Sequence, residues 1–188
     1  MKVQSSKAKG RKKTFSQGLV QVYTGNGKGK TTAALGQALR AVGHGFKVLI
    51  IQFLKGGIAY GELQSAKRLS PYLTIVPMGR ESFVKKKTPH PVDIRWARKG
   101  WDLAKRSVES QKYQLVILDE INVAIAYGMI PLGEVLSLIE KKPEKVELIL
   151  TGRWAKRRIL DAADLVTEMK ERKHYYRRGI ESRIGIER

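Results

Sequence analysis

Apolar residues along this chain fall into short runs, separated by stretches in which apolar residues recur with a helical period. The runs have the length of β-strands, and segments 48–51 and 115–118 are apolar without interruption. Uninterrupted apolar strands are typical of parallel sheets that helices cover on both faces. We therefore predict five strands, at residues 19–23, 47–53, 73–77, 114–118 and 146–150.

Amphipathic stretches between these runs predict helices. In the first, apolar residues recur at i, i+3 and i+4 spacing from Ala34 to Val42, and Gly43 suits the C-cap. Pro91 and Pro131 each open a further amphipathic stretch, because proline is well tolerated at the first helical position. Alternating strands and helices form right-handed crossovers and a parallel sheet. The predicted fold is α/β with a mostly parallel central sheet, and ligands are expected at the carboxyl ends of its strands.

Length and composition fit one globular domain. The chain has 188 residues, of which 42% are hydrophobic, so it can bury a core without disulfides or a structural metal. It has no cysteine, which excludes thiolate metal sites and fits a reducing cytoplasm. No secretory signal or membrane-spanning run is visible, so we expect a soluble, cytoplasmic protein without membrane contacts. Residues 1–17 are basic and nearly free of apolar residues, which predicts a flexible arm before a domain at 18–188.

The chain is strongly basic: 37 Lys and Arg against 17 Asp and Glu give a net charge of +20. Such an excess attracts polyanions, and nucleic acid is one candidate. A phosphate-rich substrate, solubility or heat tolerance would also account for it. The basic residues are spread along the chain without a recognised nucleic-acid-binding motif, so we expect no specific nucleic-acid partner.

Residues 24–32 link the first predicted strand to the first predicted helix. Glycines let backbone amides close around anionic oxygens, and the helix N-terminus adds its positive dipole end. In a phosphate-binding loop the lysine contacts phosphates and the next hydroxyl binds magnesium, which assigns these roles to Lys30 and Thr31. The usual pattern has glycine where this chain has a threonine. The predicted nucleotide-binding residues of the loop are Thr24, Gly25, Asn26, Gly27, Lys28, Gly29, Lys30, Thr31 and Thr32.

Polar residues follow three other predicted strands. Asp119 and Glu120 come directly after a buried run, where a carboxylate supports magnesium in P-loop enzymes; a surface turn or a helix N-cap is the alternative. Together with the phosphate-binding loop, the metal role is favoured. Arg153 has two open interpretations, as a fork onto phosphate oxygens or as the start of a solvated basic run. Lys55 is placed to reach anionic groups, and His44 is expected to satisfy carbonyls at a helix end. The histidines have no spacing that suggests zinc.

The motifs around these residues resemble those of the ATP:corrinoid adenosyltransferases, from about Gly18 to Glu187 and in the same order. The departure at Thr24 is itself usual in that family. The segments that carry the resemblance are 24–34, 40–45, 52–56, 118–122, 150–153, 162–169 and 173–174.

The resemblance implies a three-layer, recombinase-like P-loop NTPase fold. It also implies transfer of the 5′-deoxyadenosyl group of ATP to the cobalt(I) of a reduced corrinoid, with release of triphosphate. The acceptor would be cobalamin or cobyrinic acid a,c-diamide. Lys30 would neutralise the triphosphate, and Mg²⁺ would be held by Thr31, by Glu120 directly and by Asp119 through water. A homodimer, a flavoprotein-type electron donor and an N-terminal arm that covers the site belong to the same expectations.

Two positions depart from the family pattern. Relatives often carry Gly-Arg-Gly-Phe-x-Trp near the corrinoid, and their aromatics help to expel the lower cobalt ligand. Here residues 79–85 read Gly-Arg-Glu-Ser-Phe-Val-Lys, so Phe83 matches as an expected catalytic residue and Lys85 replaces the tryptophan. Trp154 stands where relatives usually have a small residue.

Two further functions fit parts of the sequence. A nucleic-acid-associated P-loop ATPase would suit the positive charge and a recombinase-like sheet. A protein that binds ATP and corrinoid with little turnover would suit the replacement at Lys85. The reaction products distinguish all three.

Overall fold

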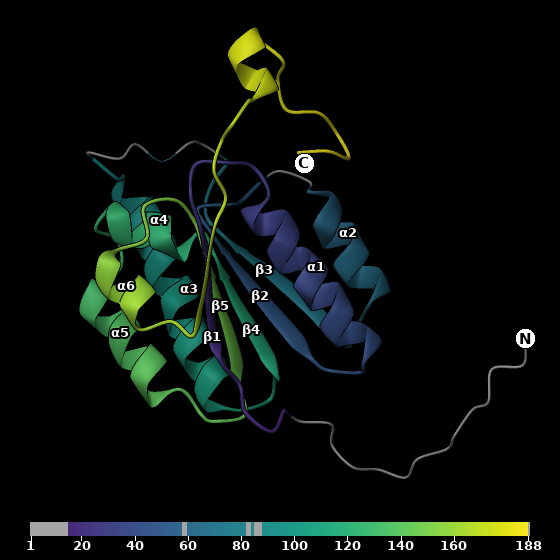
Figure 1. Cartoon of the computed structure of the whole chain (residues 1–188), viewed down its shortest axis with the longest axis vertical. Coiled ribbons are helices and arrows are strands. Elements are labelled where there is room, and N and C mark those ends of the chain that lie inside the picture. Colours follow the sequence, from purple (N-terminus) through teal and green to yellow (C-terminus); the bar gives the residue numbers. More distant parts are fainter. Residues whose placement is uncertain (1–14, 58–59, 82–83, 85–87, 188) are drawn as a thin grey trace, which may run out of the picture.

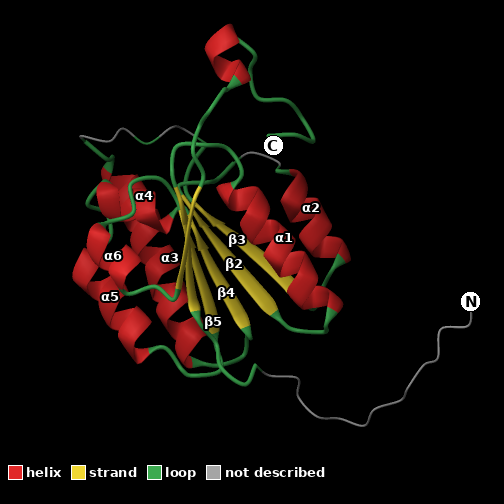
Figure 2. Ribbon diagram, in the orientation of Figure 1, coloured by secondary structure: helices red, strands yellow, loops and turns green. Residues whose placement is uncertain are grey.

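The structure is a computed structural model that describes residues 15–57, 60–81, 84 and 88–187. These residues contain one six-stranded sheet with all strands parallel, in the order β3-β2-β4-β5-β1-β6 (Figures 1 and 2). The strands are β1 (Val20–Thr24), β2 (Val48–Phe53), β3 (Leu73–Met78), β4 (Leu115–Asp119), β5 (Glu147–Thr151) and β6 (Leu165–Glu168).

Helices cover both faces of the sheet. Figure 1 shows α1 and α2 on one face and α3, α4, α5 and α6 on the other. Their bounds are α1 (Lys30–Gly43), α2 (Gly61–Arg68), α3 (Pro91–Glu109), α4 (Ile121–Ala126), α5 (Leu132–Lys141) and α6 (Arg157–Asp161), followed by the 3₁₀ helix η1 (Tyr175–Arg178). The predicted three-layer α/β architecture is confirmed. The sheet is parallel throughout rather than mostly parallel.

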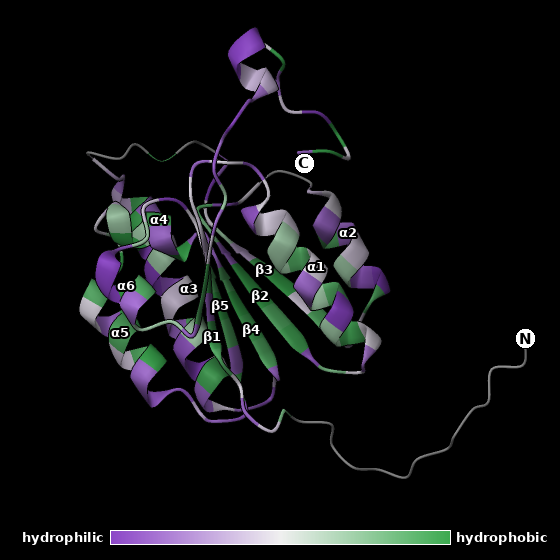
Figure 3. Ribbon diagram, in the orientation of Figure 1, coloured by the Kyte–Doolittle hydropathy of each residue, from purple (hydrophilic) through white to green (hydrophobic). Residues whose placement is uncertain are grey.

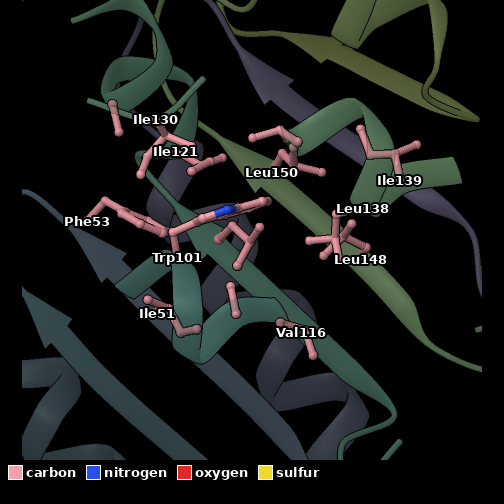
Figure 4. Packing of buried hydrophobic residues seen from close by; sticks show 14 of the residues in the cluster. Ile51, Phe53, Trp101, Val116, Ile121, Ile130, Leu138, Ile139, Leu148 and Leu150 are labelled. Atoms are coloured by element: carbon pink, nitrogen blue, oxygen red, sulfur yellow. The ribbon is translucent and has the colours of Figure 1, made fainter. Parts of the chain in front are cut away.

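Alternate side chains of the central strands enter two separate cores. Leu49, Ile51 and Phe53 of β2 belong to the core on the α3 side, and Figure 4 shows Ile51 and Phe53 beside the fully buried Trp101. Val48 and Ile50 of the same strand point to the other face and pack with α1. This two-sided burial explains the uninterrupted apolar runs, which colour the strands green in Figure 3. Each fully buried side chain of this kind contributes about 1.5–3 kcal/mol to stability.

All five predicted strands are present, each within one residue of its expected bounds. The elements that the pattern did not predict are β6, α2, α4 and α6, which have between four and eight residues. Such lengths are too short for a periodic apolar stripe. β6 lies at the edge of the sheet with all four side chains exposed, so it has no buried run to reveal it.

Two helix ends differ by one residue from the prediction. Gly43 is the last residue of α1, and His44 is the C-cap, whose backbone N–H bonds the carbonyls of Ala41 and Val42. Gly45 follows with φ +78° and bonds Val42, while Phe46 N–H bonds Ala41, which is a Schellman motif. The glycine that this ending requires is therefore Gly45 and not Gly43.

Pro131 is likewise the N-cap of α5 rather than its first residue, because its backbone is extended. The predicted arm, residues 1–17, falls mostly outside the described residues. Its last part is described, and there the ring of Phe15 packs 4.6 Å from that of Phe46. No helix in the described part of the chain has the length and apolar character that crossing a bilayer requires.

Candidate active site

The loop between β1 and α1 depends on glycines for its path. Gly25 and Gly29 have φ of +98° and +122°, which side chains disfavour. A Cβ on Gly25 would lie 2.4 Å from the carbonyl oxygen of Met169, and one on Gly27 2.8 Å from the same atom. The Gly27 amide bonds that carbonyl at 2.7 Å. The segment after β6 thus supports the loop from outside, and only glycine fits between them.

Lys30 begins α1 and folds back over the loop. Its ammonium donates to the carbonyls of Gly25 at 2.9 Å and Gly27 at 2.7 Å, and the residue is buried. Burial lowers the pKa of Lys30, while the charge of Glu120 opposes that effect. The ammonium of Lys30 therefore lies against the loop, which is where a phosphate-binding motif has its lysine.

Asp119 ends β4 with its carboxylate fully buried and surrounded by donors. One oxygen accepts from the hydroxyls of Thr31 at 2.9 Å and Thr151 at 2.7 Å. The other accepts from Lys55 at 2.9 Å and, more weakly, from Gln52 at 3.4 Å. β1, β2, β4 and β5 all end at this edge of the parallel sheet, which brings these side chains together from distant parts of the sequence.

Lys55 is the cation that balances Asp119. Burial by itself would lower its pKa, but the attraction of Asp119, and less that of Glu62 and Glu120, raises the pKa above the ordinary lysine value. Its loop is fixed by backbone contact, because a Cβ on Gly56 would lie 2.0 Å from the carbonyl oxygen of Gly79. The sequence prediction that Lys55 reaches an anionic group is confirmed, and the group is a carboxylate of the protein.

Glu120 follows Asp119 in a left-handed conformation with φ +64°. Its amide donates to Thr151 at 2.9 Å, so one buried threonine holds both acidic residues. Burial and the charge of Asp119 raise the pKa of Glu120. Glu120 does occupy the N-cap position of α4, but its side chain makes no capping hydrogen bond. Position therefore agrees with the N-cap alternative, while the carboxylate stays available for another role.

The donor set fits a magnesium ion. Thr31, Asp119 and Glu120 offer hard oxygen atoms, and burial together with the neighbouring charge of Asp119 raises the pKa of Glu120, an effect that a divalent cation would oppose. Mg²⁺ binds nucleotide sites through few protein ligands and completes its shell with water and phosphate. The described residues contain no group of three or more His, Cys, Asp or Glu placed to hold a metal. A phosphate-linked magnesium is thus better suited here than a metal in an all-protein cage.

Arg153 bridges β5 to the loop. Its guanidinium donates to the Asn26 carbonyl at 3.2 Å, so its side chain contacts the loop rather than only solvent. A cleft of about 530 Å³ opens beside them, lined by Asn26, Arg153, Glu168, Lys170, Glu171 and Arg177.

The remaining predicted site residues have different surroundings. Lys28 points to the C-terminal segment, where it donates to the Ile186 carbonyl at 3.3 Å. The Thr24 carbonyl accepts from Met169, and Thr32 is exposed on α1. Phe83, the predicted catalytic aromatic, and Lys85 lie outside the described residues.

Three residues of the site had no predicted role. Thr151 and Gln52 hold Asp119, and Met169 supports the loop. Polar residues at the carboxyl ends of otherwise apolar strands are the signal that marks Thr151 and Gln52 in the sequence. Met169 has no such signal, because its contact is made by the backbone.

Comparisons with known proteins agree with this geometry. Residues 16–188 match the family described as ATP:corrinoid adenosyltransferase BtuR/CobO/CobP. A corrinoid adenosyltransferase from Sinorhizobium sp is 38% identical over 177 residues, which cover 93% of this chain and 82% of the relative. A corrinoid adenosyltransferase from Escherichia coli K12 is 39% identical, over 91% of this chain and 86% of the relative.

Solved structures show the fold independently. The flagellar accessory protein FlaH from Methanocaldococcus jannaschii aligns with a TM-score of 0.55 and 14% identity, over 81% of this chain and 71% of its own. A KaiC-like protein from Pyrococcus horikoshii aligns with a TM-score of 0.51 and 18% identity, over 85% and 75%. These likenesses confirm the predicted recombinase-like P-loop fold. With a family match over nearly the whole domain, this chain belongs to the ATP:corrinoid adenosyltransferase family.

Proposed function

We propose that this chain transfers the 5′-deoxyadenosyl group of ATP to the cobalt(I) of a corrinoid through the site at the carboxyl edge of its sheet. One observation carries the assignment of residues. The phosphate-binding loop with Lys30 meets Asp119, Glu120 and Thr31 at that edge, where an anion and a hard cation can bind side by side.

The reaction makes one bond and breaks one. Cobalt(I) supplies the electron pair of the new cobalt–carbon bond, and the electrons of the broken C5′–O bond leave with triphosphate. The protein must hold the leaving group, stabilise its developing charge and align the two reactants. No proton has to move at the carbon, which suits a site built from cations and amides.

Each residue then has a role in holding the triphosphate. The amides of residues 25–31 surround its oxygens, and Lys30 turns from the loop carbonyls to the phosphates. Thr31 and Glu120 would bind Mg²⁺ directly and Asp119 through water; bound there, the ion supplies positive charge to the phosphate oxygens. Arg153, already against the loop at Asn26, adds a second cation to the leaving group.

The proposal includes a homodimer. The edge strand β6 exposes Leu165 and Val166, each 45% accessible, and its outer backbone edge is open among the described residues. The following segment exposes Tyr176, Ile184 and Ile186 as well. An open strand edge and exposed apolar side chains each favour association with another chain.

Cobalt(I) must be produced before it can attack, so the proposal also includes an electron donor of the flavoprotein type. The absence of cysteine in the sequence fits a reducing cytoplasm, where such donors operate. The basic N-terminal arm keeps its proposed role of covering the bound nucleotide.

Product analysis tests this function. The full chain is incubated without oxygen with ATP, Mg²⁺ and chemically reduced cobalamin. We expect a light-sensitive adenosylated corrinoid and intact triphosphate in equal amounts. Lys30→Ala should yield neither product while keeping the circular dichroism spectrum of the wild type. Release of ADP that DNA stimulates would instead identify an ATPase, and tight binding without turnover would identify a binding protein.

A further inference from the structure

Trp154 has an unusual backbone for a large side chain. Its φ is +61°, in the left-handed region that bulky residues avoid. It follows Gly152, which has φ +125°, and Arg153, whose guanidinium contacts the phosphate-binding loop. Strained residues of this kind persist where the surrounding structure holds them and cluster at ligand-binding sites.

The ring of Trp154 has a firm support and an accessible surface. It stacks on Tyr127 with ring centroids 5.9 Å apart and an angle of 29° between the planes. Tyr127 is the C-cap of α4 and packs against the core. Trp154 itself is 43% exposed. We call these two residues the aromatic pair.

The aromatic pair borders the proposed site at the carboxyl edge of the sheet. The triphosphate binds at the N-terminus of α1, which packs on one face of the sheet, whereas α4 lies on the other (Figure 1). The aromatic pair adjoins the nucleotide site from the α4 side, because Trp154 directly follows Arg153, which contacts the loop at Asn26, and α4 begins directly after Glu120.

We propose that the aromatic pair is a stacking platform for the corrinoid, with Trp154 as a residue that selects for this substrate. A corrin ring is a broad conjugated plane with apolar edges, and a rigid, half-exposed indole offers matching contact area at little entropic cost. The inference rests on the proposed function, since it takes the second reactant to be a corrinoid.

The strained backbone at Trp154 allows a variant that separates loss of the ring from loss of stability. Trp154→Gly removes the ring and also relieves the backbone, because glycine adopts φ +61° freely. This variant should therefore unfold at a temperature equal to or above that of the wild type. Its Kd for an unreduced corrinoid, measured by calorimetry, should rise about tenfold, as loss of an aromatic stacking contact predicts. Its KM for ATP should change less than twofold.

Two controls accompany it. Trp154→Phe keeps a ring and should restore most of the corrinoid affinity. Tyr72→Ala removes an aromatic residue that is 44% exposed at the amino end of β3, away from the site, and should leave both affinities unchanged.

Three results would overturn the proposal. Unchanged corrinoid affinity in Trp154→Gly would show that the ring does not touch this substrate, and a raised KM for ATP alone would place adenine there instead. A fall in unfolding temperature would show that the ring is a packing element. Because corrinoid binding is measured without turnover, it separates failure of the platform from failure of the proposed transfer reaction, which would appear as missing product in the wild type.

Discussion

Thr151 gives the most direct way to perturb the site without touching a proposed ligand. Its hydroxyl is fully buried, donates to Asp119 at 2.7 Å and accepts from the Glu120 amide at 2.9 Å. Thr151→Val keeps the shape of the side chain and removes only this hydroxyl. The variant therefore measures what the two hydrogen bonds contribute.

The magnitude follows from those bonds. A hydrogen bond to a charged group contributes about 1.5–3 kcal/mol to stability. Without the hydroxyl the buried amide of Glu120 also loses its acceptor, which costs about 1–3 kcal/mol. Asp119 keeps its donors from Thr31, Lys55 and Gln52, which reduces the first of these losses. We expect Thr151→Val to lower the free energy of unfolding by about 2–4 kcal/mol.

Urea denaturation of the ligand-free protein measures this, with Thr151→Ser as the matched control. Serine keeps the hydroxyl and loses one buried methyl group, so it should cost only about 1 kcal/mol. Magnesium-dependent ATP binding should weaken in the valine variant and remain close to normal in the serine variant. If the valine variant unfolds at the same urea concentration as the wild type, or if the serine variant loses as much free energy of unfolding as the valine variant, the hydroxyl does not hold Asp119 and Glu120 as described.

Three further predictions concern other residues. Glu120 has a raised pKa in the folded state, so its ionised form destabilises the ligand-free protein above that pKa, and this destabilisation disappears as pH falls toward the unfolded pKa. Glu120→Gln should therefore raise the melting temperature of the ligand-free protein at neutral pH, and Mg²⁺ with ATP should not raise it further. A lower melting temperature of the ligand-free variant would contradict this. The paired hydrogen bonds from Arg80 lower the pKa of Asp93. The ionised carboxylate therefore stabilises the fold fully above the unfolded pKa of Asp93, and this stabilisation is lost as pH falls through the folded pKa. Asp93→Asn should lower the free energy of unfolding by about 1–3 kcal/mol at pH 7 and flatten its dependence on acid pH in urea titrations. An unchanged dependence on acid pH would show that the ion pair does not stabilise the fold. Phe83→Ala should slow adenosyl transfer from cobalt(II) precursors and spare pre-reduced cobalt(I); equal slowing in stopped-flow assays of both would rule out a role in expelling the lower ligand.

The sequence predicted those parts of the fold that bury apolar surface. The five long runs became strands because each is covered by helices on both faces, and the loop at 24–32 took its predicted place between β1 and α1. β6 escaped prediction because its four side chains are exposed and only its backbone, paired with β1, makes it a strand. Local patterns do not record such pairing.

The site was predictable where a motif names the chemistry and not where contacts arise from topology. Lys30 folds over its own loop and Thr31 donates to Asp119, so the lysine and the hydroxyl of the phosphate-binding motif lie beside the carboxylate that follows β4. The bond from Lys55 to Asp119 joins residues 64 apart in sequence, and that from Thr151 spans 32. Such partners follow only from the order of strands in the sheet, which places the ends of β2, β4 and β5 together.

ATP binding tests the central claim most directly. Calorimetric titration of the folded protein with ATP and Mg²⁺ should show saturable binding of one nucleotide per chain, and inorganic triphosphate alone should compete for the site. Lys30→Ala should weaken this binding at least tenfold. An absence of binding heat in folded wild-type protein, or equal affinity for adenosine and ATP, would contradict the claim that the loop after β1 grips the triphosphate.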